Sequence, residues 1–156
     1  MNHQVVEEES LKDEMRNLIE EARMLLPGIQ ALFGFQTIAV FNDRFEDLAE
    51  TVKDCHLLAL GLVVLAIGLC ITPAAYHRIA EPGCVTRRAV RLSSEFICAA
   101  LAPLACGIAL DMYVVIFLAT DSQAASLGGA IAAFVILMGL WFVFPFHSRR
   151  RKKPPV

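Results

Sequence analysis

The chain has 156 residues, of which 56% are hydrophobic, and a formal net charge of −2. A soluble domain of this length cannot bury the four long apolar runs that it contains, so the composition excludes a soluble globular protein and indicates one polytopic membrane domain. The sequence shows no zinc-ligand spacing, phosphate-binding loop, nucleophile elbow or nucleic-acid module. We therefore predict no enzyme activity, no metal site, no cofactor and no nucleic-acid partner.

Residues 1–26 are expected to form an acidic, amphipathic helix in the cytoplasm. Ser10 begins a capping-box pattern. Apolar residues then follow at helical spacing: Leu11, Met15, Leu18, Ala22 and Leu25. The opposite face is acidic and would be repelled by anionic lipid, so we expect the apolar stripe to pack on protein, either this chain or a neighbouring subunit. Pro27 and Gly28 interrupt the pattern and predict a hinge before the first membrane span.

Four apolar runs predict transmembrane helices, at about 25–41, 55–76, 97–119 and 125–146. A helix of about 20 residues crosses the hydrocarbon layer, and backbone groups in lipid must pair within their own segment. The predicted fold is all-α. It is a four-transmembrane-helix bundle over residues 27–148, with the N-terminal cytoplasmic amphipathic helix before it and a basic cytoplasmic tail, 149–156, after it.

The distribution of basic residues predicts the orientation of the spans. The first 24 residues hold three, the connection between the second and third runs holds four and the tail holds five, whereas the other two connections hold two and none. Lys and Arg concentrate in cytoplasmic loops. Both termini are therefore expected in the cytoplasm. An aromatic belt from Trp141 to Phe146, directly before the tail, supports the same orientation.

Rows of small residues predict close packing of helices, because water does not drive helices together within lipid. They are Gly61, Gly68 and Ala75 in the second run, Ala99, Pro103 and Gly107 in the third, and Ala125, Gly129 and Ala133 in the fourth. Some rows will pack within the bundle. Their number also indicates a homo-oligomer, and which rows lie between subunits stays open.

Asp111 is the costliest residue in the apolar runs, since a carboxylate near the middle of a span costs about 2.5–3.5 kcal/mol. It continues the row of small residues on the third run and is expected to face protein. One interpretation is a site that binds a proton or a cation; the other is a carboxyl that only pairs helices. Gln30 and Gln36 interrupt the first run. They are either amides that join helices or a polar lining opposite Asp111.

Three further polar positions lie at the cytoplasmic ends of the runs. Glu95 follows Arg91 by four residues, so a structural ion pair is expected, with a place on a permeation path as the alternative. His77 and Arg78 close the second run and are candidate residues of the cytoplasmic interface. His77 and His147 end two runs on the same side, which makes a b-type haem between them a minor alternative.

Two motifs carry a resemblance to a known family. They are residues 21–23 with 28–36, which include both glutamines, and residues 73–78, which include His77 and Arg78. They resemble a family of small bacterial four-helix membrane proteins that is catalogued only as a domain of unknown function. The resemblance extends over most of residues 20–148. It implies four spans and a bacterial inner-membrane setting, and it implies no activity.

The leading functional hypothesis is an oligomeric channel or transport protein, permeable to ions or protons, in the bacterial inner membrane. Asp111, Gln30, Gln36 and Glu95 would contribute to its polar path. The alternative is a non-conducting interaction or scaffold protein that binds a protein partner through its N-terminal helix. A haem-binding redox protein is the third hypothesis. Each of them would contact membrane lipid.

Overall fold

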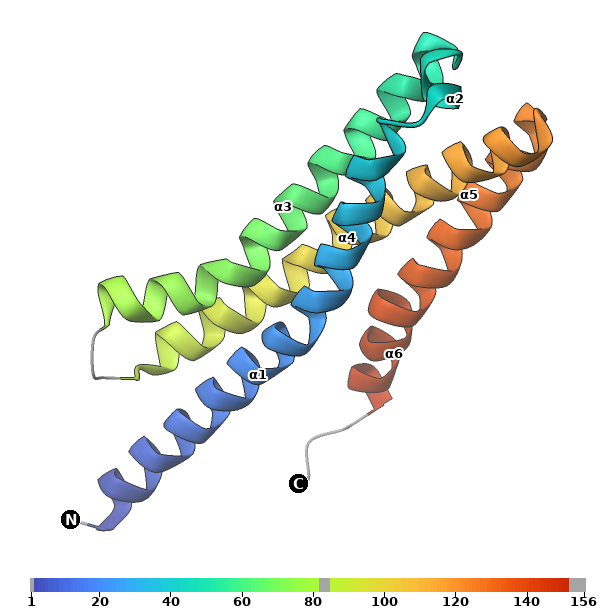
Figure 1. The fold of residues 1–156 in the computed structure, drawn as a ribbon. Helices are drawn as coiled ribbons and strands as arrows, with labels where there is room; N and C mark the ends of the chain where they lie inside the picture. Colours follow the sequence, from blue (N-terminus) through green and yellow to red (C-terminus); the bar gives the residue numbers. More distant parts are fainter. Residues whose placement is uncertain (1, 82–84, 152–156) are drawn as a thin grey trace.

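The computed structural model describes residues 2–81 and 85–151, so only the first part of the basic tail is covered. Over these residues the chain is helical and has no strand, as predicted. The elements are α1 (Asn2–Ala39), α2 (Asp43–Glu46), α3 (Glu50–Ala80), α4 (Arg87–Thr120), α5 (Gln123–Met138), the π-helical turn η1 (Gly139–Val143) and α6 (Phe144–Arg151) (Figure 1).

Within the described residues, three helices are long and apolar enough to cross a membrane: Glu50–Ala80, Arg87–Thr120 and Gln123–Arg149. They contain the second, third and fourth predicted spans. The first predicted span, 25–41, forms the second half of α1. In that helix a polar segment precedes the apolar run and the helix ends at Ala39, so α1 is not among these three.

The hinge predicted at Pro27 does not separate two helices: α1 continues from Asn2 to Ala39 with Pro27 inside it. A proline inside a helix removes one backbone hydrogen bond, and surrounding contacts can compensate for that loss. Leu26 and Ile29, on either side of Pro27, pack against the core formed with α3 and α4. Tertiary packing therefore holds the helix through the proline.

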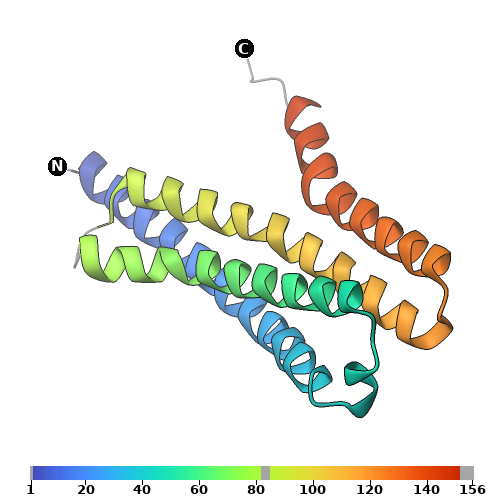
Figure 2. The same ribbon diagram turned by 90° about the horizontal axis from the view of Figure 1, so that it is seen from above.

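Helices α1, α3 and α4 lie side by side, whereas α5 turns back from the end of α4 and α6 ends apart from the other helices (Figures 1 and 2). The core between the first three consists of apolar and small residues: Ile29, Val63, Ala66, Cys70, Ala100 and Leu104. In α5, Ser126 is buried and most large side chains are exposed, including Val135 at 60% and Ile136 at 58%. Helix α5 therefore presents most of its apolar surface to its surroundings.

Gly107 allows α3 and α4 to approach closely. A Cβ atom at this position would lie 3.1 Å from Val63 Cγ2 and 3.3 Å from the carbonyl oxygen of Ala59. The second neighbour is backbone and cannot move without shifting α3. Of the small-residue row predicted on the third run, Gly107 is thus used where α4 meets α3, whereas Ala99 is exposed.

The other two rows differ in their surroundings. A Cβ atom at Gly129 would meet the side chain of Ile116, so the row on α5 faces α4. Gly61 and Gly68 have open space where a Cβ atom would lie, so the row on α3 faces away from this chain. The α3 row is therefore available for contact with lipid or with another molecule.

The N-terminal half of α1 packs on the chain's own helices, as one of the two predicted alternatives requires. Met15 is 3% exposed and forms a buried cluster with Ala89 and Val90 of α4, with Tyr76 packed against it. Ser93 of α4 also contacts the sulfur of Met15, at 3.7 Å. The apolar side of this segment is therefore occupied within the chain.

Candidate functional site: a buried polar cluster

Three helices bring Gln36 of α1, His56 of α3 and Asp111 of α4 into contact. The amide nitrogen Nε2 of Gln36 donates a hydrogen bond to Asp111 Oδ2 at 2.6 Å. The ring nitrogen Nδ1 of His56 lies 4.0 Å from Asp111 Oδ1, and Nε2 lies 2.9 Å from the backbone oxygen of Gln36. Gln36 and His56 are 4% and 3% exposed, and the side chain of Asp111 is 15% exposed.

The position of Gln36 follows from the repeat along α1. Met15, Ala22, Ile29 and Gln36 are buried and lie seven residues apart. Seven residues make nearly two helical turns, so these four positions form one seam against α3 and α4. The first three are apolar. The fourth places an amide in the same buried line, where it needs a hydrogen-bond partner.

The contacts of His56 determine which of its nitrogens carries a proton. A backbone carbonyl can only accept, so His56 Nε2 donates to the Gln36 oxygen. Nδ1 is then a bare acceptor in the neutral ring and a donor in the imidazolium. Because Nδ1 faces the Asp111 carboxyl, one proton can sit on either group without changing the total charge of the pair. This arrangement suits uptake and release of a proton.

The side-chain oxygen Oε1 of Gln36 is buried and has no hydrogen-bond partner. The bond to Asp111 fixes the amide so that its nitrogen faces the carboxylate and its oxygen does not. An unpaired buried acceptor costs about 1–3 kcal/mol. A ligand that donates hydrogen bonds, such as water, hydronium or ammonium, would satisfy this atom.

Two cavities adjoin the cluster. One, of about 160 Å³, is lined by all three polar residues together with apolar side chains that include Phe35 and Val115. The other, of about 200 Å³, is lined by His56, Asn42 and Phe45 and so lies toward the connection between α1 and α3. The Phe45 ring meets the His56 ring edge-on, with centroids 5.3 Å apart. His56 lines both cavities, as do Ala39, Val114 and Leu118.

In the opposite direction, the core of Val63, Ala66, Ala100 and Leu104 closes the space between α1, α3 and α4. These residues are at most 6% exposed. Within the described part of one chain, the cluster is therefore adjoined by cavities on one side and by packed apolar side chains on the other.

Two of the predicted site residues are not part of the cluster. Gln30 is exposed on α1. Glu95 lies near the other end of α4 and forms the predicted ion pair with Arg91, whose Nε is 2.9 Å from Glu95 Oε1. Both members are more than half exposed. Gln36 was expected either to join helices or to line a path opposite Asp111, and its hydrogen bond to Asp111 joins α1 to α4.

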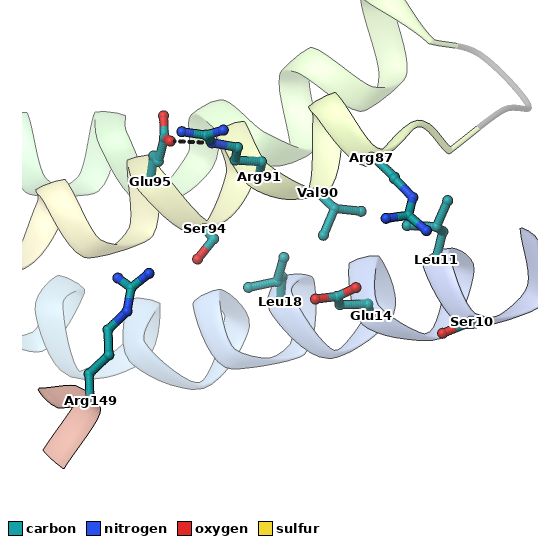
Figure 3. A pocket seen from close by; sticks show the side chains of 10 residues that line it. All are labelled: Ser10, Leu11, Glu14, Leu18, Arg87, Val90, Arg91, Ser94, Glu95 and Arg149. Atoms are coloured by element: carbon teal, nitrogen blue, oxygen red, sulfur yellow. Dashed lines mark hydrogen bonds and ion pairs between the residues drawn. The ribbon is translucent and has the colours of Figure 1, made fainter. Parts of the chain in front are cut away.

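The Arg91–Glu95 pair lies beside a groove of about 760 Å³ between α1 and α4 (Figure 3). Arg149 extends into this groove from α6, and Glu14 faces it from α1. The lining thus mixes acidic and basic side chains from three helices, and the close-up shows Arg91 turned toward Glu95 along α4.

The two histidines proposed as haem ligands lie in different surroundings. His77 is half-buried on α3, and its Nδ1 has no hydrogen-bond partner, whereas His147 is exposed on α6. Arg78 is exposed beside His77. Among the described residues, no group of three or more His, Cys, Asp or Glu side chains could hold a metal ion.

Sequence reasoning missed His56 as a site residue, because it looked for a second histidine on the same side of the membrane. A usable signal was present. Gln36, His56 and Asp111 each lie near the same end of their apolar run when the direction of each helix is taken into account. Polar residues at one depth in neighbouring helices are candidates for direct contact.

The fold and the cluster define a helical protein with three helices able to cross a membrane and a buried polar site between helices. Residues 5–145 match the family of unknown function DUF6328, and the chain belongs to that family. The match confirms the resemblance carried by the two motifs. No curated protein and no solved structure shows significant similarity to the chain.

Proposed function

We propose that this is an integral membrane protein that takes up and releases protons at the Gln36–His56–Asp111 cluster, as the binding station of an oligomeric channel or transporter for protons or ions. The observation that carries the proposal is the pairing of an imidazole nitrogen with a carboxylate beside a cavity. Such a pair binds a proton and passes it on without a metal or cofactor. The setting we propose is the bacterial inner membrane.

A fourth membrane crossing by residues 25–41 belongs to this proposal. Ile29 of that segment lies in the same core as Val63 of α3 and Leu104 of α4. On its outer side the segment exposes Phe35, Ile38 and Phe41, at 73%, 67% and 83%. Large apolar side chains in this position are suited to contact with lipid, and the basic residues favour both termini in the cytoplasm.

The proposed proton route begins at the cavity lined by Asn42 and Phe45. A hydronium ion there gives its proton to His56, and the pair then holds this proton between His56 Nδ1 and the Asp111 carboxylate. The packed core bars a direct route through one chain. The smaller cavity is lined by Phe35 and Val115, which are exposed at 73% and 58%. A second copy on this side would supply the rest of the path.

The test is proton flux into liposomes that contain purified protein. Wild type should exceed empty liposomes, and Asp111→Asn should reduce the flux at least tenfold, since the amide cannot ionise. Glu95→Gln is the matched control, because it changes a carboxylate to an amide in the same helix and lies outside the cluster. It should leave the flux unchanged.

Two other outcomes would contradict either the role of Asp111 or conduction itself. Equal flux in wild type and Asp111→Asn would keep a conducting path and remove Asp111 from it. Flux no greater than that of empty liposomes, from protein shown to be folded and assembled, would overturn conduction.

The second candidate function is a non-conducting interaction protein that acts through α1. The observation favouring it is the exposed acidic surface of that helix, which carries Glu9, Asp13, Glu14, Glu20 and Glu21. Because the apolar side of the segment is covered by α4, a partner would have to recognise this acidic face. Replacing Glu14 and Glu21 by Gln should then abolish partner binding without changing the fold.

A further inference from the structure

A groove of about 400 Å³ lies between α1 and α3, at the end of the molecule away from the polar cluster. Its lining includes Lys12, Arg16 and Arg23 from α1 and His77 from α3, with Glu20 as the one acidic residue. The groove is therefore strongly basic, although the first 24 residues taken together are acidic.

The arrangement along α1 explains this difference. Lys12, Arg16 and Arg23 are all of the basic residues in that segment. At about 100° per residue, they fall within about 40° of one another around the helix. Asp13 and Glu14 lie on other sides of the helix. Arg16 is nevertheless paired with Asp13, whose Oδ1 lies 2.9 Å from Arg16 Nη2, so the charge of Arg16 is partly balanced. The sequence-based expectation that anionic lipid is repelled concerned the acidic side and does not apply to this side.

Two polar groups at the groove lack a partner within the described residues. His77 Nδ1 is buried and makes no hydrogen bond. Arg23 forms none of the observed ion pairs. Buried polar nitrogens are rarely left unpaired, and a guanidinium binds phosphate through two parallel hydrogen bonds. An oxyanion in the groove would satisfy both groups, with the His77 ring turned to present its nitrogen.

The groove lies where each of its two helices changes from polar to apolar. Arg23 directly precedes the apolar run of α1, and His77 directly follows that of α3. Next to them, Met24 and Ile79 are exposed at 74% and 81%. A phosphate at Arg23 would therefore have apolar side chains beside it, on which acyl chains can lie.

Gln30 lies on α1 below Arg23, on the side of the helix that faces the groove. It stands seven residues after Arg23, which places it on the same side of α1 and about 10 Å deeper. It is exposed and forms none of the observed side-chain hydrogen bonds. An unpaired amide in lipid is costly, and the ester carbonyls of a phospholipid lie just below its phosphate. The amide of Gln30 is placed to donate to them.

We propose that this groove is a binding site for an anionic phospholipid. Arg23, His77 and Lys12 hold the phosphate, and Gln30 contacts the ester region. The proposal shares with the proposed function only the requirement that this end of the molecule lies at a membrane surface. It does not depend on proton exchange at Asp111. The larger groove of Figure 3 is a weaker candidate because acidic side chains line it as well.

The experiment measures binding of phosphatidylglycerol to the full-length protein by native mass spectrometry from detergent. The test variant is Arg23→Gln with His77→Gln. The matched control is Arg78→Gln with Arg88→Gln, which removes at least as much charge at exposed positions that do not line the groove. The test variant should bind at least about tenfold more weakly, the ratio expected from one lost charge-assisted hydrogen bond. The control should bind as the wild type does.

Further arms distinguish the source of the phosphate. Phosphatidylcholine should bind weakly and equally to all three proteins, and millimolar inorganic phosphate should not displace the lipid. Displacement by inorganic phosphate would overturn the assignment to lipid and indicate a site for a soluble phosphate. Equal losses in test and control variants would show that only general charge attraction acts, and would overturn the site. A thermal unfolding measurement in phosphatidylcholine checks that both variants are folded.

Discussion

The same three helices associate in two different ways at the two ends of their contact. In the half nearer the two grooves, α1, α3 and α4 meet through small and apolar residues such as Ala66 and Ala100. In the other half, they meet through the hydrogen bonds of Gln36, His56 and Asp111. Apolar side chains such as Val52 and Val114 are buried in the second half as well, so there the polar groups add to packing by shape.

The difference shows how helices can be held together where the hydrophobic effect gives little help. Close approach gains many small dispersion contacts, and it tolerates no added atoms at its tightest point. A polar cluster gains fewer, directional contacts, and it is costly when one partner is lost. Only the polar half can also bind a ligand. The following substitutions separate the two contributions, in order of decreasing expected effect.

Gly107→Leu should destabilise the protein most. Its Cβ atom alone would lie 3.3 Å from the backbone of Ala59, so the rest of the side chain forces α3 and α4 apart. Overpacking of this kind costs about 3 kcal/mol or more. The measurement is reversible unfolding in mixed micelles with increasing denaturing detergent.

Gly61→Leu is the control for that substitution. It lies on α3, and no atom lies within 4 Å of its added Cβ. We expect almost no loss of stability in the isolated chain. Equal losses at both glycines would contradict close packing of α3 and α4 at Gly107.

The second prediction concerns the bond between Gln36 and Asp111. A double-mutant cycle with Gln36→Leu and Asp111→Leu should give a coupling energy of about 1.5 kcal/mol, near the upper limit measured for hydrogen bonds within membrane proteins. The losses of unfolding free energy in the two single variants should add up to more than the loss in the double variant, because each single variant leaves one polar group unpaired. A coupling energy near zero would show that this bond does not hold the helices.

His56→Phe should have a smaller effect on stability. The new ring keeps the edge-on contact with Phe45 and removes only the donor to the Gln36 carbonyl. One neutral hydrogen bond is worth about 1 kcal/mol. Nitrogen NMR of the wild type provides the complementary check: His56 should carry its proton on Nε2 when the ring is neutral. A neutral ring protonated on Nδ1 would contradict the described arrangement.

Glu95→Gln should have the smallest effect. Its ion pair with Arg91 is exposed, and exposed pairs of this spacing contribute about 0.3–0.5 kcal/mol. The loss should shrink further as salt is added, since salt screens exposed charges. A loss above about 1 kcal/mol would show that Glu95 has a further contact in the assembled protein.

Contacts between residues close in the sequence could be predicted from local patterns, whereas contacts between distant residues could not. The Arg91–Glu95 pair follows from a spacing of four residues on one helix. By contrast, Gln30 and Gln36 were both proposed as lining, although six residues on a helix place them about 120° apart. Only Gln36 could face the same side as Ile29. That seam becomes visible once α1 is known to continue through Pro27, which depends on its packing against α3 and α4.

The unbroken course of α1 has a mechanical consequence. Arg23, at the basic groove, and Gln36, in the polar cluster, belong to one continuous helix and are separated by about 20 Å along its axis. Pro27 lies between these two residues and removes one backbone hydrogen bond, so they are linked as far as packing against α3 and α4 holds the helix at that point. If the two proposals above hold, a phospholipid bound at Arg23 would therefore be coupled through α1 to the amide of Gln36 that donates its hydrogen bond to Asp111.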